Sequence, residues 1–222
     1  MWDALGHLLP LAVAGAISSV TITAAIIILL SPNQRRSSIP FLLGLVVGIG
    51  TVTFVFALFA RTLPLSPNRT PQVAIGIVEI VIGIALEVLA VVEWRRRPRT
   101  PSAAEPRWLR TVGALGPWSS LALGFGLAVR PKAILLSIAA GLAISGATLT
   151  GWQFAVSLAV YTLISTSTVI ALVVVALSSS KRTRPWLEST RTWIAGNGSL
   201  ITVVVLAIVG VFVLGNGLIR MG

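Results

Sequence analysis

The sequence predicts an all-α integral membrane protein with six transmembrane helices in a single domain, residues 1–222. Of its residues 55% are hydrophobic. Only 10% are charged, whereas soluble domains carry about 25%. Apolar runs longer than about 18 residues recur, and each can cross a hydrocarbon core of about 30 Å. The few charged side chains cannot solvate a globular surface, which excludes a soluble enzyme, a nucleic-acid-binding domain and a secreted module.

Six apolar segments are separated by polar breaks. Most breaks contain proline, asparagine or charged residues, which favour turns, and the fourth is short and uncharged. The first segment is expected to span the membrane, because it lacks a basic leader and is too long for the apolar part of a signal peptide. The predicted spans are residues 4–30, 39–61, 71–94, 117–147, 152–178 and 199–219, with a polar loop from 178 to 199.

The distribution of basic residues predicts the orientation. Twelve of the 17 Lys and Arg residues lie on the first, third and fifth loops, and three lie on the opposite side. Cytoplasmic loops are enriched in Lys and Arg. We therefore expect a multi-pass protein of the cytoplasmic (inner) membrane with both termini outside. The net charge of +11 then reflects loops that face lipid headgroups, and no nucleic-acid partner is expected.

Weak internal similarity predicts two inverted three-helix repeats. The expected repeats are residues 1–94 and 117–222, joined by a cytoplasmic Arg- and Pro-rich linker, 95–116. Because each half has three spans, the two halves cross the membrane in opposite directions, as in many secondary transporters. Two pairs of short segments match: Phe41-Leu-Leu-Gly44 with Phe154-Ala-Val-Ser157, and Val81-Ile82-Gly83-Ile84 with Ile208-Val209-Gly210-Val211.

The first and fourth segments are the longest, and each contains a polar interruption. The first has Ser18-Ser19-Val20-Thr21, and the fourth has Arg130-Pro131-Lys132. Proline removes a backbone donor and crowds the preceding turn. A broken helix inside the membrane is tolerated where it is buried in protein or lines a wet cavity. Both helices are therefore predicted to break near the midplane, at a shared binding site.

Arg130 and Lys132 are predicted to bind an anion. A cation at the centre of a span costs about 2.5–3.5 kcal/mol on insertion scales, so a compensating group is expected. Exposed backbone N–H groups beside Pro131 and two cations suit a phosphate or carboxylate. The interruption Ser18, Ser19 and Thr21 is expected to complete this substrate site.

Two other interpretations of these cations remain open. In one, Arg130 and Lys132 pair with Glu79 and Glu87 of the third segment and bind no ligand. In the other, the fourth segment is a re-entrant hairpin that places Arg130 at a membrane interface.

The acidic residues of the third segment are candidates for proton or counter-charge roles. Glu79 is expected near mid-membrane, where a desolvated carboxylate binds a proton more readily, or it pairs with Arg130. Glu87 is closer to the cytoplasmic end, and Glu93 is expected at the interface beside Trp94.

Hydroxyl and glycine patterns have two interpretations each. The hydroxyls line a transport pathway or bond to carbonyls of their own helix. Gly44-xxx-Gly48 forms a dimer seam or packs inside the bundle. The candidate pathway hydroxyls are Thr51, Thr53, Ser165, Thr166 and Thr168.

Catalytic and metal sites are not expected. The chain has no Cys, and its one histidine, His7, cannot form a multi-histidine site. No nucleotide-binding loop, nucleophile elbow or zinc-protease motif is present. The sequence therefore predicts neither an enzyme nor a cofactor.

Two stretches resemble a known exporter superfamily. Ala128 to Leu136 resembles the Asn-Pro-Lys stretch of the LysE exporter superfamily. Leu9-Pro10-Leu11, followed by the stretch from Gly15 to Ile22, resembles one branch more closely. That branch is the actinobacterial GAP-like proteins, named for addressing glycopeptidolipid and sulfolipid to the cell surface. The resemblance covers nearly the whole chain in length, span number and spacing.

The resemblance implies six spans, two inverted repeats and export of small or lipidic substrates. By position, Arg130, Pro131 and Lys132 match the second-half motif, and Ser18 to Thr21 match the first-half break. Arg130 stands where the superfamily usually has Asn, and Ser19 and Thr21 stand where it usually has prolines. These differences make the site more positive and the first break less sharp.

The leading hypothesis is a transporter or flippase for an anionic lipid or lipid-linked glycan precursor. Its partners would be the membrane lipid substrate, and a homodimer or envelope lipid-export machinery are further hypotheses. One alternative is a proton-coupled exporter of amino-acid-type solutes, with Glu79 facing a compact pocket. The other is a non-transporting scaffold for lipid export, which depends on Arg95, Arg96 and Arg97.

Overall fold

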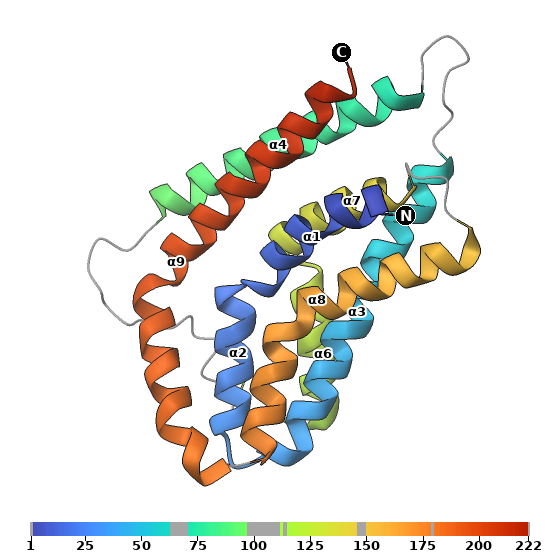
Figure 1. Cartoon of the computed structure of the whole chain (residues 1–222). Helices are drawn as coiled ribbons and strands as arrows, with labels where there is room; N and C mark the ends of the chain where they lie inside the picture. The colour runs from blue at the N-terminus through green and yellow to red at the C-terminus, as the bar shows by residue number, and fades with distance from the viewer. Residues whose placement is uncertain are drawn as a thin grey trace.

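The computed structural model is all-helical over the residues that it describes, 2–62, 71–96, 112, 115–145, 150–178 and 180–221. Figure 1 shows the helices as a tilted bundle in which α4 and α9 lie side by side. In chain order the helices are α1 (Trp2–Ala16), α2 (Ser19–Leu30), α3 (Gln34–Thr62), α4 (Pro71–Arg95), α6 (Pro117–Ala128), α7 (Pro131–Ser145), α8 (Gly151–Ser178) and α9 (Ser180–Ile219).

Four to six candidate membrane spans are present in the described part of the chain. Helices α3, α4, α8 and α9 are each long and apolar enough to cross alone. The other two candidates are bent pairs: α1 and α2 meet at 50°, and α6 and α7 meet at 63°. Large apolar side chains such as Leu43, Phe59 and Val81 are exposed, as expected where lipid is the solvent. The protein is thus a multi-pass membrane protein.

The bends lie at the predicted interruptions. The first helix pair breaks at Ile17–Ser18, and the second breaks at Val129–Arg130. The linker expected at 95–116 lies largely outside the described residues.

The loop predicted between 178 and 199 is wrong, because the residues from Ser180 onward form one helix with the sixth apolar segment. The polar composition of this stretch suggested a loop. However, Leu187 and Ile194 lie seven residues apart, on one helical face. Both are buried in the same apolar cluster as Ile26 and Ile28 of α2. This apolar stripe keeps the stretch helical although Pro185 lies within it.

The two helices of each bent pair pack into different hydrophobic cores. One core contains Leu8 and Leu11 of α1 together with the buried residues of α7, α4 and the end of α9. The other contains the buried residues of α2 with Leu127 of α6, α3 and α8. Each break therefore lies where the chain passes from one core to the other, which is where polar backbone can avoid apolar packing.

Glycines bring α3 and α6 close together. A Cβ on Gly44 would collide with the Leu121 carbonyl of α6, and a Cβ on Gly124 would collide with the Phe41 carbonyl of α3. A Cβ on Gly48 would lie 2.8 Å from the Ala128 Cβ. The Gly44-xxx-Gly48 pattern thus packs inside the bundle, the second of the two interpretations that the sequence allows.

Glycines also join α4 to α9, which run antiparallel. A Cβ on Gly83 would lie 2.6 Å from Leu214 Cγ, and a Cβ on Gly210 would lie 2.5 Å from the Glu87 carboxylate. At the far end of this pair, Arg220 Nε lies 3.1 Å from Glu79 Oε2. Glu79 is buried, so this ion pair fixes the end of α9 against α4.

The α3–α6 contact generates a stability prediction with a matched control. Gly44→Ala should lower the free energy of unfolding by about 1–3 kcal/mol, because the new methyl group must displace backbone. Gly126→Ala, on α6 where a Cβ meets nothing within 4 Å, should be neutral or stabilising by up to about 1 kcal/mol. Unfolding followed by circular dichroism in detergent measures both, and equal losses would contradict the contact.

The Glu79–Arg220 pair generates a second stability prediction. Arg220→Gln should destabilise the protein by about 3 kcal/mol, because it leaves the buried Glu79 carboxylate unpaired. Glu79→Gln should cost less, because 23% of the Arg220 side chain is exposed and water can solvate its charge. The double variant should lose less than the sum, with a coupling energy of about 1 kcal/mol or more. The same unfolding measurement on the two single variants and the double variant completes a double-mutant cycle. Additive losses of the free energy of unfolding would show that the two charges do not interact.

Candidate functional site

The two helix breaks face one cavity. Ser18 and Thr21 come from the first break, and Arg130 and Lys132 come from the second. Helices α3 and α8 close the other sides. The lining comprises Gly15, Ser18, Thr21, Leu45, Ile49, Leu127, Arg130, Lys132, Ala133, Leu136, Ser137, Tyr161 and Ser165. Four of the six residues predicted to bind substrate therefore meet here. Ser18 and Thr21 lie more than a hundred positions from Arg130 and Lys132 in the sequence.

Lys132 bridges the two breaks directly. Its Nζ donates a hydrogen bond of 3.0 Å to the carbonyl oxygen of Ile17, which follows the last residue of α1. Helix ends leave carbonyls without intrahelical partners, and a cation at that end also complements the helix dipole. The second-half cation thus stabilises the first-half break.

Two helix N-termini begin at the cavity. Helix α2 starts directly after Ser18, whose side chain makes no capping hydrogen bond. Instead, Ser18 Oγ accepts a hydrogen bond of 3.0 Å from Thr21 Oγ1. Helix α7 starts at Pro131, between the two cations. N-termini carry partial positive charge and free N–H donors, so the cavity is suited to an anion.

Ser19 and Pro131 do not line the cavity. Ser19 Oγ lies 3.0 Å from Thr202 Oγ1, a hydrogen bond that joins α2 to α9. Pro131 is exposed and forms the first residue of α7. Both residues shape the breaks, since one anchors α2 and the other begins α7.

The predicted acidic partners lie elsewhere. Glu79 pairs with Arg220, and the Glu87 carboxylate packs against Gly210. Neither lines the cavity, and the alternative in which Glu79 pairs with Arg130 does not occur, because Glu79 pairs with Arg220. Glu87 Oε1 is buried without a hydrogen-bond partner among the described residues.

Glu93 is the acidic residue that sequence reasoning missed. Its carboxylate is close enough to interact electrostatically with both Arg130 and Lys132. Its place beside Trp94 suggested a simple interfacial residue. Helix α4 packs against α7, which brings Glu93 close to the two cations. No local sequence pattern predicts this packing.

The predicted pathway hydroxyls divide into three groups. Ser165 lines the cavity, and Thr53 is fully buried. Thr166 Oγ1 donates to the Thr162 carbonyl at 2.8 Å, the self-bonding alternative. Thr51 is exposed and Thr168 is half-buried, and neither lines the cavity.

Tyr161 is a second residue that sequence reasoning missed. It is the only tyrosine in the chain, it is 2% exposed, and it lines the cavity. Its hydroxyl faces those of Ser137, Ser165 and Thr53. The available signal was a tyrosine within a predicted span, because the hydroxyl of a buried tyrosine usually has a hydrogen-bond partner.

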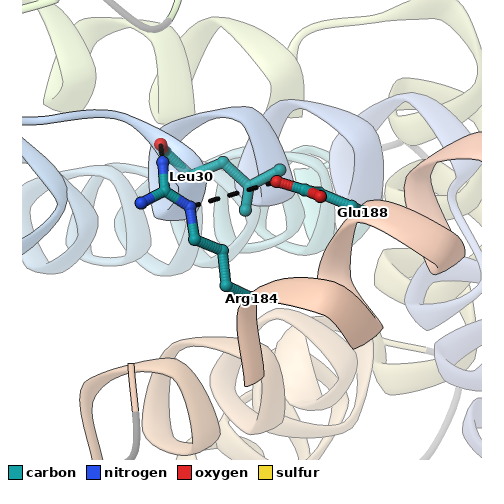
Figure 2. Close-up of polar contacts among 3 residues, drawn as sticks. All are labelled: Leu30, Arg184 and Glu188. Carbon is teal, nitrogen blue, oxygen red and sulfur yellow. Dashed lines mark hydrogen bonds and ion pairs between the residues drawn. The ribbon is translucent and has the colours of Figure 1, made fainter. Parts of the chain in front are cut away.

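A second cavity, of about 250 Å³, lies at the turn between α2 and α3. Figure 2 shows Arg184 of α9 donating from Nη2 to the Leu30 carbonyl, at 3.3 Å, with its Nε 4.0 Å from Glu188. Gln34 Nε2 donates to the Ala176 carbonyl of α8 at 3.1 Å. These bonds satisfy the ends of α2 and α8 and join them to the neighbouring helices.

The described residues contain no group of three or more His, Cys, Asp or Glu side chains that could hold a metal ion.

Comparison with known proteins identifies one family. No curated protein and no solved structure matches the chain. A family model described as Sap, sulfolipid-1-addressing protein, matches residues 8–219. The match includes both helix breaks and every residue of the cavity between them. The chain therefore belongs to the sulfolipid-1-addressing protein family.

Proposed function

We propose that this protein is a transporter or flippase that moves an anionic lipid, or a lipid-linked glycan precursor, across the cytoplasmic membrane toward the cell envelope. The observation that carries the proposal is the cavity in which Arg130, Lys132 and two helix N-termini converge. The family description, which concerns the addressing of a sulfolipid, supports a lipid as the cargo.

The proposed architecture is a six-span inverted repeat, which also agrees with the resemblance to the LysE superfamily. Exchanging the halves maps α1–α2 onto α6–α7, α3 onto α8 and α4 onto α9. The observed contacts α3–α6 and α2–α9 then become α8–α1 and α7–α4, which are also observed. Gly83 and Gly210, which the sequence pairs, make reciprocal contacts across α4 and α9. Such symmetry would set both breaks near the midplane.

The present conformation is interpreted as a closed state. The cavity has a volume of about 40 Å³, which is room for a few water molecules and too little for a lipid headgroup. Transport would require the bent pairs to separate. In this mechanism the anionic headgroup replaces the Ile17 carbonyl as the partner of Lys132, and Glu93 balances the cations when the site is empty.

The proposed orientation places both termini outside and the basic loops in the cytoplasm. Figure 1 shows the start of α1 and the end of α9 toward one side, and the α2–α3 turn, the end of α8 and the start of α9 at the other. Arg35, Arg36 and Arg184 are exposed at the latter end. Because cytoplasmic loops are enriched in Lys and Arg, these exposed arginines support the proposed orientation.

The transport prediction concerns the cation pair. In liposomes that contain the full chain and a fluorescent anionic lipid, Arg130→Ala and Lys132→Ala should each reduce the initial flip rate about tenfold or more, because a charge-assisted hydrogen bond is lost. Arg130→Lys and Lys132→Arg should retain part of the rate. Quenching of the outer-leaflet fluorophore measures the transport.

Matched variants separate the alternatives. Arg35→Ala removes an exposed cation outside the cavity and should leave the rate unchanged. Arg95→Ala with Arg96→Ala should also leave it unchanged, whereas a scaffold that acts through its basic loops would lose function. Wild-type rates in both cavity variants would contradict the anion site. Transport of only small solutes, abolished by collapse of the proton gradient, would favour the solute exporter.

The orientation prediction uses the absence of native cysteines. A membrane-impermeant maleimide applied to intact cells should label a Met221→Cys variant. It should label an Asn33→Cys variant only after the cells are permeabilised, because Asn33 lies in the α2–α3 turn. The unlabelled wild type is the control, and the reverse pattern of labelling would invert the proposed topology.

A further inference from the structure

The cavity at the α2–α3 turn has no part in the proposed transport. Its volume of about 250 Å³ exceeds the volume of about 40 Å³ of the cavity between the helix breaks, and the two cavities share no lining residue. The end of α2, the start of α3 and the start of α9 form it. The break at Ser18 and this cavity lie at opposite ends of α2, about 16 Å apart along the helix axis, so the cavity is a separate site.

The lining of this second cavity is partly apolar and partly polar. Leu29 and Leu187 are each 3% exposed and belong to one hydrophobic core, so they form an apolar wall. Ser31 and Gln34 are held by hydrogen bonds to the carbonyls of Ile28 and Ala176. Among the described residues that line the cavity, Arg184 is the only charged one. Such a lining complements a molecule that joins an acidic group to an apolar part.

The guanidinium of Arg184 has hydrogen-bonding capacity left for a ligand. Its Nη2 donates to the Leu30 carbonyl at 3.3 Å. Its Nε lies 4.0 Å from Glu188 Oε1, which is too long for a hydrogen bond. Figure 2 shows the remaining guanidinium nitrogen pointing away from Glu188. Because a guanidinium carries five N–H donors and exposed ion pairs are weak, an anion can compete with Glu188 for this side chain.

The surroundings of the cavity match the headgroup level of a membrane. Arg35 and Arg36, at the start of α3, are exposed beside Gln34. Trp186 is exposed two residues after Arg184, and tryptophan is enriched where membrane and water meet. The proposed orientation places this end of the bundle at the cytoplasmic leaflet. Basic pockets between transmembrane helices on that side bind anionic lipid headgroups.

We propose that this second cavity binds an anionic phospholipid of the cytoplasmic leaflet, with Arg184 holding the phosphate and Leu29, Leu30 and Leu187 contacting the apolar part. The bound lipid joins the start of α9 to the α2–α3 turn. It is a resident lipid and not the cargo. The inference therefore goes beyond the proposed function and does not require that Arg130 and Lys132 bind a substrate.

The experiment compares two phospholipids with identical acyl chains. Phosphatidylglycerol carries a net negative charge, whereas phosphatidylcholine carries a choline cation that the basic surroundings would repel. Retention of each lipid by the purified full chain is measured by native mass spectrometry. The wild type should retain phosphatidylglycerol in preference, and Arg184→Ala should weaken its binding about tenfold, the effect of losing a charge-assisted hydrogen bond. Arg184→Lys should retain part of the binding, because the charge is kept.

Two further variants make the test specific. Glu188→Gln removes the carboxylate that competes for Arg184 and should strengthen phosphatidylglycerol binding about twofold, the scale of an exposed charge interaction. This variant leaves the Arg184–Leu30 hydrogen bond in place, so it tests the site even if Arg184→Ala folds poorly. Arg96→Ala is the matched control, because Arg96 is an exposed cation after α4 that lines neither cavity. It should bind as the wild type does.

The outcomes separate this site from the cavity between the breaks. Arg130→Ala combined with Lys132→Ala should keep the Arg184-dependent binding. If that double variant loses all retained phosphatidylglycerol while Arg184→Ala loses none, the second site is overturned and the proposed function is left standing. Equal retention of the two lipids by the wild type, or equal losses in Arg96→Ala and Arg184→Ala, would also overturn it.

A soluble competitor distinguishes a lipid from a free phosphate compound, since both present the same acidic group. Glycerol 3-phosphate in excess should not displace the bound phosphatidylglycerol, because it has no acyl chain to contact the leucine wall. Complete displacement that depends on Arg184 would overturn the lipid as the occupant and would identify a soluble phosphate compound instead.

Discussion

The structure depends on one constraint: backbone polar groups that are exposed by a helix break must find partners away from water. The hydrogen bond from Lys132 to the Ile17 carbonyl meets this requirement across the two halves of the chain. The same hydrogen bond explains why a costly cation is tolerated inside the bundle. The Lys132 ammonium gains an acceptor, and the carbonyl at the end of the broken helix gains a donor. The cavity forms beside this hydrogen bond, so the contact that stabilises the breaks also shapes the site at which we propose that an anion binds.

The packing of the helices around the Lys132–Ile17 hydrogen bond follows from the two helix breaks. Each bent pair contributes one half to each hydrophobic core, and glycines let backbone meet backbone along α3–α6 and α4–α9. Without a strong hydrophobic force between helices in lipid, such close approach supplies much of the packing energy. The polar cavity lies beside the α3–α6 contact, and both of these helices contribute residues to its lining.

Sequence reasoning predicted most of the fold because long apolar runs and polar interruptions are local signals. The breaks at Ser18 and Arg130 are examples. It also brought Ser18, Thr21, Arg130 and Lys132 into one candidate site, because each stood out as a polar group in an apolar run. It did not find the roles of Glu93 and Tyr161 or the Glu79–Arg220 pair, since these depend on which helix faces which. The helix at 180–198 was missed because its apolar stripe is only two residues, Leu187 and Ile194, among polar neighbours.

Helix α9 has a mechanical consequence. It is a continuous helix of 40 residues, about 60 Å long, which contacts α2 near one end and α4 near the other. Figure 1 shows that α9 bends between its first and last parts. Because the chain stays helical through this bend, a change in the bend would carry a movement from the Arg184–Leu30 contact to the Arg220–Glu79 contact through the backbone of one helix.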